Sequence, residues 1–168
     1  MLSNQVNATD CAELPKTIYK GVLILEDKRF FTHSGFDFYA ILRAIKINLT
    51  KKSILQGAST IEQQLVRIIT NEKEINFGRK FKEIILATLI SEKYEKIKLL
   101  KCYCNIYPFD NCIGIGELCQ VNRYDLNSLS IYNVSEIVAR IKYPVITKKN
   151  YIRYLKRVRK VQIKLELC

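Results

Sequence analysis

Apolar residues recur every three or four positions along most of the chain, which is the spacing of amphipathic helices. This spacing predicts helices over residues 16–25, 38–49, 59–70, 79–101, 135–142 and 151–167. Within the helix predicted over residues 79–101, a break is expected near Tyr94. No stretch alternates apolar and polar residues over the length of a strand. The predicted fold class is therefore mainly α.

Polar and glycine-bearing segments separate the predicted helices. Loops are expected at residues 50–58, 71–78 and 107–116, of which the first is basic and able to move. Ser59 and Glu62 form a predicted capping box at the start of the third helix. In the last helix one face is expected to carry Tyr151, Leu155, Val158 and Leu165. Another face is expected to carry most of Arg153, Lys156, Arg157 and Lys160.

The length of 168 residues and the hydrophobic content of 48% suit one globular domain with a sizeable core. We expect a loosely ordered lead-in at residues 1–14 and the domain at residues 15–168. No run approaches the roughly 18 apolar residues of a membrane span. Residues 1–10 lack the basic-then-apolar layout of a signal peptide. These features predict either a cytoplasmic protein or one whose targeting segment lies outside this chain.

The net charge of +12 favours an anionic partner: nucleic acid, an anionic membrane surface or a phosphate-bearing substrate. Much of the excess is C-terminal, because from Arg140 onward there are ten Lys/Arg residues and one acid, Glu166. The six cysteines match no metal-binding pattern, since Cys102 and Cys104 have no nearby histidine that would complete a zinc site. We expect free thiols that pack as small hydrophobic residues.

Glu26 and Asp27 follow the apolar run at residues 22–25, and the segment up to Asp37 holds the single histidine of the sequence, His33. A carboxylate at the end of an apolar segment can be partly desolvated, which raises its pKa toward that of a working base. The competing interpretation is an exposed helix turn, which is the commoner setting for adjacent acids. Taken alone, this stretch leaves the choice open.

A second segment, residues 56–64, places small residues before a capped helix, whose N-terminal N–H groups can bind an anion. Gln63 and Gln64 are neutral donors and acceptors suited to sugar hydroxyls, and Arg67 lies one turn beyond Gln63. The alternative is a well-capped helix with two surface glutamines. The segment therefore fits an anion-binding site without requiring one.

In a third segment, Arg79 and Glu83 are i,i+4 neighbours on a helix, beside Lys80. A surface ion pair worth a few tenths of a kcal/mol would explain them. The same three residues would also be explained by a site in which cations bind a phosphate and hold a carboxylate in place.

In this order, the three segments resemble the motifs of glycosyltransferase family 51, the peptidoglycan glycosyltransferases, which include the monofunctional enzymes and the N-terminal domain of class A penicillin-binding proteins. The motif E-D-x-x-F-x-x-H-x-G is filled by Glu26, Asp27, Phe30, His33 and Gly35. The motif G-[GA]-S-T-x-x-Q-Q is matched by Gly57 to Gln64, and R-K-x-x-E by Arg79, Lys80 and Glu83. A fourth motif, K-x-x-I-L-x-x-Y-L-N, is matched more loosely by Lys96, Leu99, Leu100, Tyr103 and Asn105. The resemblance covers roughly residues 14–167.

The resemblance implies a mainly α, lysozyme-like helical domain that polymerises lipid II at the outer face of the bacterial cytoplasmic membrane, with inversion and release of undecaprenyl pyrophosphate. It implies that Glu26 is the general base. It implies that Glu83 is the second catalytic carboxylate, which orients the acceptor or organises the nearby cations. It implies substrate contacts by Asp27, Phe30, Ser59, Gln63, Gln64, Arg67, Arg79 and Lys80. His33 is implied to shape the first motif rather than to catalyse.

The implied partners are lipid II and the growing glycan chain, an anionic membrane surface and other cell-wall synthesis proteins, and no nucleic acid is expected. No metal ligands are predicted, and a divalent cation (Mg²⁺ or Mn²⁺) at the pyrophosphate stays an open alternative. The chain departs from the family pattern at Arg67, where lysine is common, at Ile75, where an arginine is usual, and at Asp110, where glycine is usual. These positions bear on catalytic competence.

Two other classes of function stay open. A lysozyme-like glycoside hydrolase would also use two carboxylates in a helical domain, but hydrolysis needs no pyrophosphate site. A basic helical module, or a degenerate member of the family, would bind lipid II, anionic membrane or nucleic acid without catalysis, and its binding would weaken steeply with salt.

Overall fold

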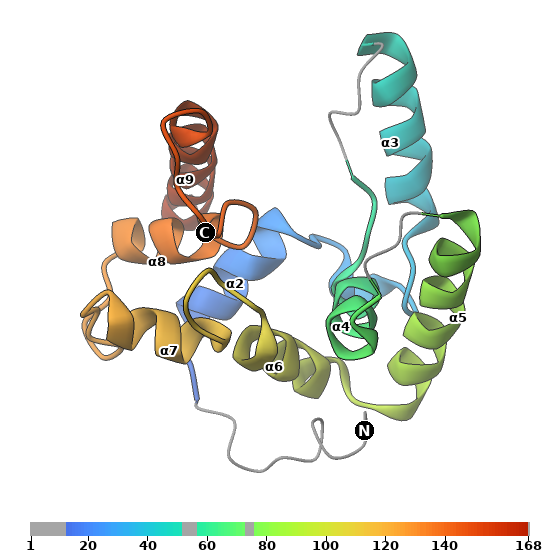
Figure 1. Cartoon of the computed structure of the whole chain (residues 1–168), viewed down its shortest axis with the longest axis horizontal. Helices are drawn as coiled ribbons and strands as arrows, with labels where there is room; N and C mark the ends of the chain where they lie inside the picture. The colour runs from blue at the N-terminus through green and yellow to red at the C-terminus, as the bar shows by residue number, and fades with distance from the viewer. Residues whose placement is uncertain (1–12, 52–56, 73–75, 168) are drawn as a thin grey trace. The chain divides into compact units, whose positions relative to one another are not determined.

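The structure is a computed structural model that describes residues 13–51, 57–72 and 76–167. Its helices are α2 (Lys16–Leu25), the 3-10 helix η1 (Phe30–Thr32), α3 (Phe38–Lys51), α4 (Ile61–Thr70), α5 (Phe77–Lys93), α6 (Lys96–Ile106), α7 (Gly114–Val121), α8 (Ile131–Ala139) and α9 (Tyr151–Glu166) (Figure 1). Within these described ranges no strand forms, and one isolated antiparallel bridge joins Pro108 and Ile113. The mainly α prediction is confirmed.

The chain divides into two compact units. Unit 1 contains the described residues up to Lys28 together with those from Leu100 onward. Unit 2 is Arg29–Leu99. The predicted lead-in falls mostly outside the described residues, but Leu14 at its end is buried in unit 1 and its N–H donates to the hydroxyl of Tyr19 at 3.3 Å.

Helices α2, α7, α8 and α9 pack together in unit 1. Helix α2 lies against α8 and α9, α8 lies against α9, and α7 contacts α8 (Figure 1). The contact of α2 with α8 is close at Gly21, where a Cβ atom would lie 3.0 Å from a methyl group of Val138. The side chains that are fully buried in this core include Ile18, Val22, Ile115, Ile137 and Val161. Burial of these apolar side chains is the main stabilising contribution to unit 1.

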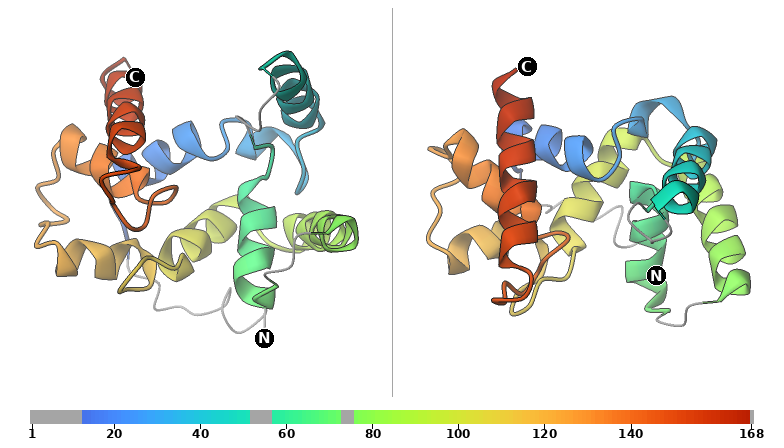
Figure 2. Two further views of the ribbon diagram at one scale, coloured as in Figure 1. Left: turned by 45° about the horizontal axis from the view of Figure 1, so that its top comes forward. Right: turned by 90° about the horizontal axis from the view of Figure 1, so that it is seen from above.

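Helices α4 and α5 lie side by side in unit 2, as Figures 1 and 2 both show. The loop before α3 approaches α5 closely, because a Cβ on Gly35 would lie 2.4 Å from the backbone carbonyl of Ala87. Gly35 also has a φ of +85°, a backbone conformation that other residues adopt at a cost. The carbonyl of Gly35 accepts a hydrogen bond from the Thr60 hydroxyl at 2.7 Å. The first and second motifs are thereby joined at the start of α4.

Several predicted boundaries are confirmed. Helix α2 has the predicted limits, α9 differs from its prediction by one residue, and the predicted break near Tyr94 separates α5 from α6. Tyr94 is extended there, with φ −123° and ψ 145°, so the helical hydrogen bonds stop. The loops predicted at 50–58 and 71–78 lie partly outside the described residues, since 52–56 and 73–75 are not described.

Other boundaries were wrong, each for a local reason. The cap of α4 is Thr60 and not Ser59, because the Thr60 side chain accepts the hydrogen bond from the Gln63 N–H. Helix α8 begins at Ile131 and not at Ser135, because Ser130 and Asn133 form a reciprocal capping box. Helices α3 and α6 extend beyond their predicted ends, and α7 begins within the loop predicted at 107–116.

The predicted inner face of α9 was partly wrong. Val158 and Leu165 are buried as expected, but Tyr151 and Leu155 are exposed. Their places in the core are taken by Tyr154 and Val161. Tyr154 and Val158 pack with Ala139, Tyr143 and Ile146, so contacts outside the helix select which of two similar stripes turns inward.

Cys102, Cys104, Cys112 and Cys119 are buried and free, as predicted for these four. Burial raises the pKa of the Cys119 thiol to about 11 and raises the pKa of Cys104 still further. These thiols are protonated at neutral pH and act as small core side chains. In the described part of the chain, no helix has both the length and the hydropathy needed to cross a membrane.

Candidate functional site

Helix α5 carries three predicted site residues on one side. Its N-cap is Asn76, whose side-chain oxygen accepts a hydrogen bond from the Arg79 backbone N–H at 2.7 Å. Because the helix begins at Phe77, Arg79 and Glu83 are one turn apart on the same face, with Lys80 beside them. Glu83 is the centre of this group, and only 2% of its side chain is exposed.

Three cations surround the carboxylate of Glu83. Arg67, on α4, donates from Nε to Oε1 at 2.8 Å and from Nη2 to Oε2 at 3.1 Å. Arg79 pairs with Oε1, and the Nζ of Lys80 lies 3.3 Å from Oε2. The two-pronged contact needs a guanidinium, so Arg67 makes a pair of bonds that a lysine at this position would not. We call Arg67, Arg79, Lys80 and Glu83 the cation cluster.

Lys80 extends the cation cluster to the second motif. Its Nζ donates to Ser59 Oγ at 3.0 Å and also to Gln63 Oε1. Gln63 is buried, and its Nε2 lies 3.5 Å from the Gly35 carbonyl. Gln64, the next residue of α4, is half-buried. Within unit 2 the structure thus gathers five of the predicted substrate-binding residues, namely Ser59, Gln63, Arg67, Arg79 and Lys80, around Glu83.

Opposing effects set the charges in the cation cluster. Burial acts to raise the pKa of Glu83, but the hydrogen bond and charge of Arg67, and then of Lys80, outweigh it and the pKa is lowered. Burial lowers the pKa of Lys80, and the charge and hydrogen bond of Glu83 oppose that effect. Glu83 is therefore ionised at neutral pH. With Lys80 protonated, three positive charges face one negative charge and leave an excess of two.

This excess of positive charge can bind an anion such as a pyrophosphate. A simple surface ion pair does not describe the group, because Glu83 is buried. The four residues of the cation cluster do not fit a resident Mg²⁺ or Mn²⁺, because such an ion would need several free carboxylate or carbonyl oxygens as ligands. Glu83 is the single carboxylate among the four residues of the cation cluster, and it already accepts from three cations.

Phe30 also belongs to unit 2. It is buried, and its ring lies edge-on to His33, with the ring centroids 6.3 Å apart. The Nζ of Lys96 lies 4.7 Å from the Phe30 ring centroid and also forms an ion pair with Glu62, which is fully buried. His33 is half-buried, in keeping with a role in packing the first motif. The sequence reasoning gave Glu62 only the role of a helix-capping partner, and its pairing with Lys96 was missed.

Glu26 and Asp27 belong to unit 1. Glu26 ends α2, and its N–H donates to the Val22 carbonyl at 2.8 Å. Its carboxylate pairs with Arg157 of α9, and only 13% of its side chain is exposed. Asp27 is also buried, with 7% exposed. The exposed-turn interpretation is therefore wrong for both acids, and for Glu26 the covering side chain is Arg157 of α9.

Arg157 is a residue that the sequence reasoning placed wrongly. It was assigned to a basic face of the last helix, but 19% of its side chain is exposed and it pairs with Glu26. No motif contains Arg157, and 130 residues lie between the two partners in sequence. The sequence of α9 does indicate a cation-rich helix, because it has basic residues on nearly every turn. That pattern does not show which of its arginines pairs with an acid.

The residues at which the chain departs from the family pattern have different settings. Asp110 lies in an exposed turn, where its carboxylate is 3.4 Å from the Asn111 side-chain nitrogen. Ile75 and the nearby Lys73 lie outside the described residues.

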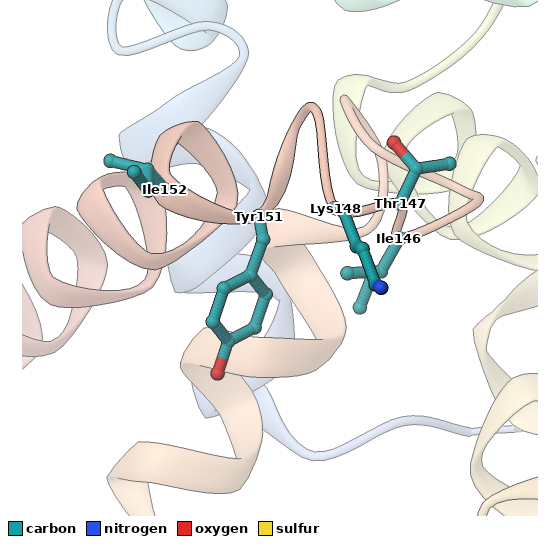
Figure 3. Close-up of a pocket in the computed structure, with 5 residues that line it drawn as sticks. All are labelled: Ile146, Thr147, Lys148, Tyr151 and Ile152. Atoms are coloured by element: carbon teal, nitrogen blue, oxygen red, sulfur yellow. The ribbon is translucent and has the colours of Figure 1, made fainter.

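A pocket lies at the start of α9 in unit 1, with a volume of about 390 Å³ (Figure 3). It is lined by Ile146, Thr147, Lys148, Tyr151 and Ile152. None of these residues is a predicted site residue, and the lining contains no carboxylate that could act as a base. The pocket is therefore separate from the residues predicted to carry the chemistry.

The family model for the transglycosylases matches residues 2–165. Penicillin-binding protein 4 of Bacillus subtilis (strain 168) is 38% identical over 109 residues, which are 64% of this chain and 18% of that protein. Penicillin-binding protein 1A of Neisseria cinerea is 32% identical over 138 residues, which are 81% of this chain and 17% of that protein. The protein of the same name in Neisseria gonorrhoeae is 35% identical over 114 residues, 67% of this chain and 14% of that protein. This chain spans less than a fifth of the length of these relatives.

Sequence motifs, helical fold and family match all agree on one classification. The match to the family model extends over nearly the whole chain, and the described part of the chain is mainly helical, as the motifs predicted. The chain therefore belongs to the transglycosylase family, the peptidoglycan glycosyltransferases of glycosyltransferase family 51.

Proposed function

We propose that this chain polymerises lipid II into glycan strands. In this reaction the 4-hydroxyl of the acceptor sugar attacks the anomeric carbon of the donor, and undecaprenyl pyrophosphate leaves with inversion. The observation that carries the proposal is the cation cluster, in which Arg67, Arg79 and Lys80 leave an excess of positive charge around a buried carboxylate. A leaving pyrophosphate is the group whose growing negative charge such an excess would stabilise.

Each site residue has a proposed role. Glu26 takes the proton from the attacking hydroxyl, a role that requires a carboxylate which is ionised before the reaction. Glu83 holds Arg67, Arg79 and Lys80 in place, since it contacts all three. Ser59, Gln63 and Gln64 line the donor site, and Asp27 and Phe30 support the first motif. No step is assigned to a metal ion, because the cation cluster does not offer suitable ligands.

The experiment is polymerisation of labelled lipid II by the purified chain and by its Glu26→Gln variant. Loss of a general base costs about 10²- to 10⁴-fold in rate, so the variant is expected to be at least a hundredfold slower. Glu166→Gln is the matched control, because it removes an exposed carboxylate at the end of α9 and should keep the wild-type rate. Equal rates for wild type and Glu26→Gln would refute the assignment of the base.

The same assay separates the other classes of function. Release of reducing ends from finished peptidoglycan, with no polymer formed from lipid II, would identify a glycoside hydrolase instead. Binding of lipid II without turnover would identify a degenerate member of the family. Salt-sensitive binding to duplex DNA with no activity on lipid II would identify a nucleic-acid-binding module.

We also propose that the chain works against the outer face of the bacterial cytoplasmic membrane, where other cell-wall synthesis proteins are its expected partners. Support comes from α3, on which apolar side chains are exposed beside the basic residues Arg43 and Lys46. The exposed apolar residues of α3 are Phe38, Tyr39, Leu42, Ile45 and Leu49. A helix of this kind can lie in the headgroup region and favours anionic lipids.

Vesicle co-sedimentation tests the membrane proposal. We expect the chain to bind vesicles containing anionic lipid more than neutral vesicles, and the double change Leu42→Ser and Leu49→Ser to weaken that binding. Ile152→Ser is the control, because it changes an exposed apolar residue of α9 in unit 1. Equal binding to neutral and anionic vesicles would contradict the proposal.

A further inference from the structure

Glu26 and Arg157 form an ion pair within unit 1. One nitrogen of the guanidinium, Nη2, contacts Oε1 of the carboxylate. The two side chains are 13% and 19% exposed, respectively. The pair forms because α9 packs against α2, at whose end Glu26 lies. In such a largely buried setting, an opposite charge acts on a carboxylate more strongly than it does in water.

Other groups also act on Glu26. From α9, the charge of Glu26 opposes the lowering of the Lys160 pKa, which burial and then Arg157 and Lys164 cause. From α6, Tyr103 is fully buried, and burial and then the charge of Glu26 raise its pKa well above the ordinary value. Tyr103 therefore stays a neutral phenol at physiological pH.

Helix α8 also packs against α2. Where α8 meets α2 at Gly21, its side chains are the apolar Val134 and Val138. Among the groups near Glu26, Arg157 is a cation in direct contact, Lys160 is a second cation at longer range, and Tyr103 is a neutral neighbour.

We propose that Arg157 is a positioning residue, which fixes the orientation of the Glu26 carboxylate for proton transfer. This inference rests on the proposed function, in which Glu26 is the base. An arginine suits the task because its guanidinium is charged at every working pH and is planar, so one nitrogen can hold one oxygen in a fixed direction. Arg157 acts through Glu26 and has no proposed contact with the substrate.

The proposal predicts a particular change in the kinetics. Without the guanidinium of Arg157, the carboxylate of Glu26 is no longer held in one direction, so proton transfer is slower at saturating substrate. A small misplacement of a catalytic group can cost about a hundredfold in rate, so kcat should fall at least about tenfold while KM changes little. A merely structural role would lower the stability of the chain and leave the kcat of the folded protein unchanged.

The experiment measures kcat and KM of lipid II polymerisation for the full chain, with circular dichroism as the check on folding. Arg157→Gln is expected to lower kcat at least about tenfold with little change in KM. Arg157→Lys keeps the charge but not the planar geometry, so its kcat should lie between those of the wild type and Arg157→Gln while KM changes little. Arg159→Gln is the matched control, since it removes an exposed charge from the same helix and should change neither quantity.

The outcomes separate this inference from the proposed function. A folded Arg157→Gln variant with a wild-type kcat, or with a change confined to KM, would overturn the role of Arg157 and leave the polymerase assignment standing. If that variant fails to fold, Arg157→Lys decides: a lower kcat with little change in KM supports the role, and a wild-type kcat or a change confined to KM overturns it. A wild-type chain that forms no polymer would overturn both proposals together.

Discussion

Breaking the ion pair between Lys96 and Glu62 should be among the most destabilising changes in unit 2. Glu62 is fully buried on α4, and the Nζ of Lys96 contacts its Oε1. Replacing Lys96 by methionine keeps the length of the side chain but leaves the carboxylate buried without this partner. Removing one member of a buried pair costs about 3–5 kcal/mol. We expect the lower end of this range, because 21% of the Lys96 side chain is exposed and water reaches it.

A loss of about 3 kcal/mol is a large part of the roughly 5–15 kcal/mol that stabilises a typical domain. Urea unfolding followed by circular dichroism measures it. With a slope of about 1–3 kcal/mol per molar urea, the midpoint should fall by roughly 1–3 M. Lys98→Met is the matched control, because Lys98 and Glu95 are both exposed and 4.0 Å apart. That exposed pair should contribute less than about 1 kcal/mol.

The double variant Glu62→Met with Lys96→Met completes the test. When both partners become apolar, no charge stays buried, so most of the lost stability should return. The non-additivity of the two changes measures their coupling directly. The reasoning would be refuted if Lys96→Met cost no more than the Lys98→Met control. It would also be refuted if the double variant were no more stable than Lys96→Met alone.

Three further predictions concern unit 2. Gly35→Ala should lose at least about 2 kcal/mol in urea unfolding, because the new Cβ meets the Ala87 backbone at 2.4 Å and φ is +85°. Gly57→Ala, which has open space, should be nearly neutral, and equal losses would contradict this account. Thr60→Ala should cost about 1–2 kcal/mol through the lost cap of α4 and hydrogen bond to Gly35, and an unchanged midpoint would count against it. The stabilisation that accompanies the lowered pKa of Glu83 is present above the unfolded value of about 4.3 and is lost as pH falls through the lower folded value. Wild type should therefore lose more stability between pH 6 and pH 3 than Glu83→Gln does, and parallel curves would rule this out.

Part of the cation cluster could be predicted because its geometry is local. Arg79 and Glu83 are one helical turn apart, so any helix over these residues places them together. The family motifs added Ser59, Gln63 and Arg67 as candidate site residues, and the structure places each of them in contact with Lys80 or Glu83. Periodicity alone would have left Glu83 as one half of an exposed ion pair.

Other features depended on contacts that no local pattern encodes. Ser59 and Thr60 are equally good hydroxyl caps in the sequence, and Thr60 serves because its hydroxyl also reaches the Gly35 carbonyl. On α9, Tyr151 and Tyr154 begin two similar apolar stripes. The stripe of Tyr154 turns inward because Ala139 packs against it.

The sequence by itself determined the helical class, most helix positions, the family and the identity of Glu26 as the candidate base. These follow from the spacing of apolar residues and from motifs whose members lie within a few turns of one another. Only the tertiary structure decided that Arg157 pairs with Glu26, and that Glu62 is buried against Lys96. The reason is physical: a charge in α9 acts on the end of α2 only after apolar packing has excluded water between the helices, and that burial depends on the whole of unit 1.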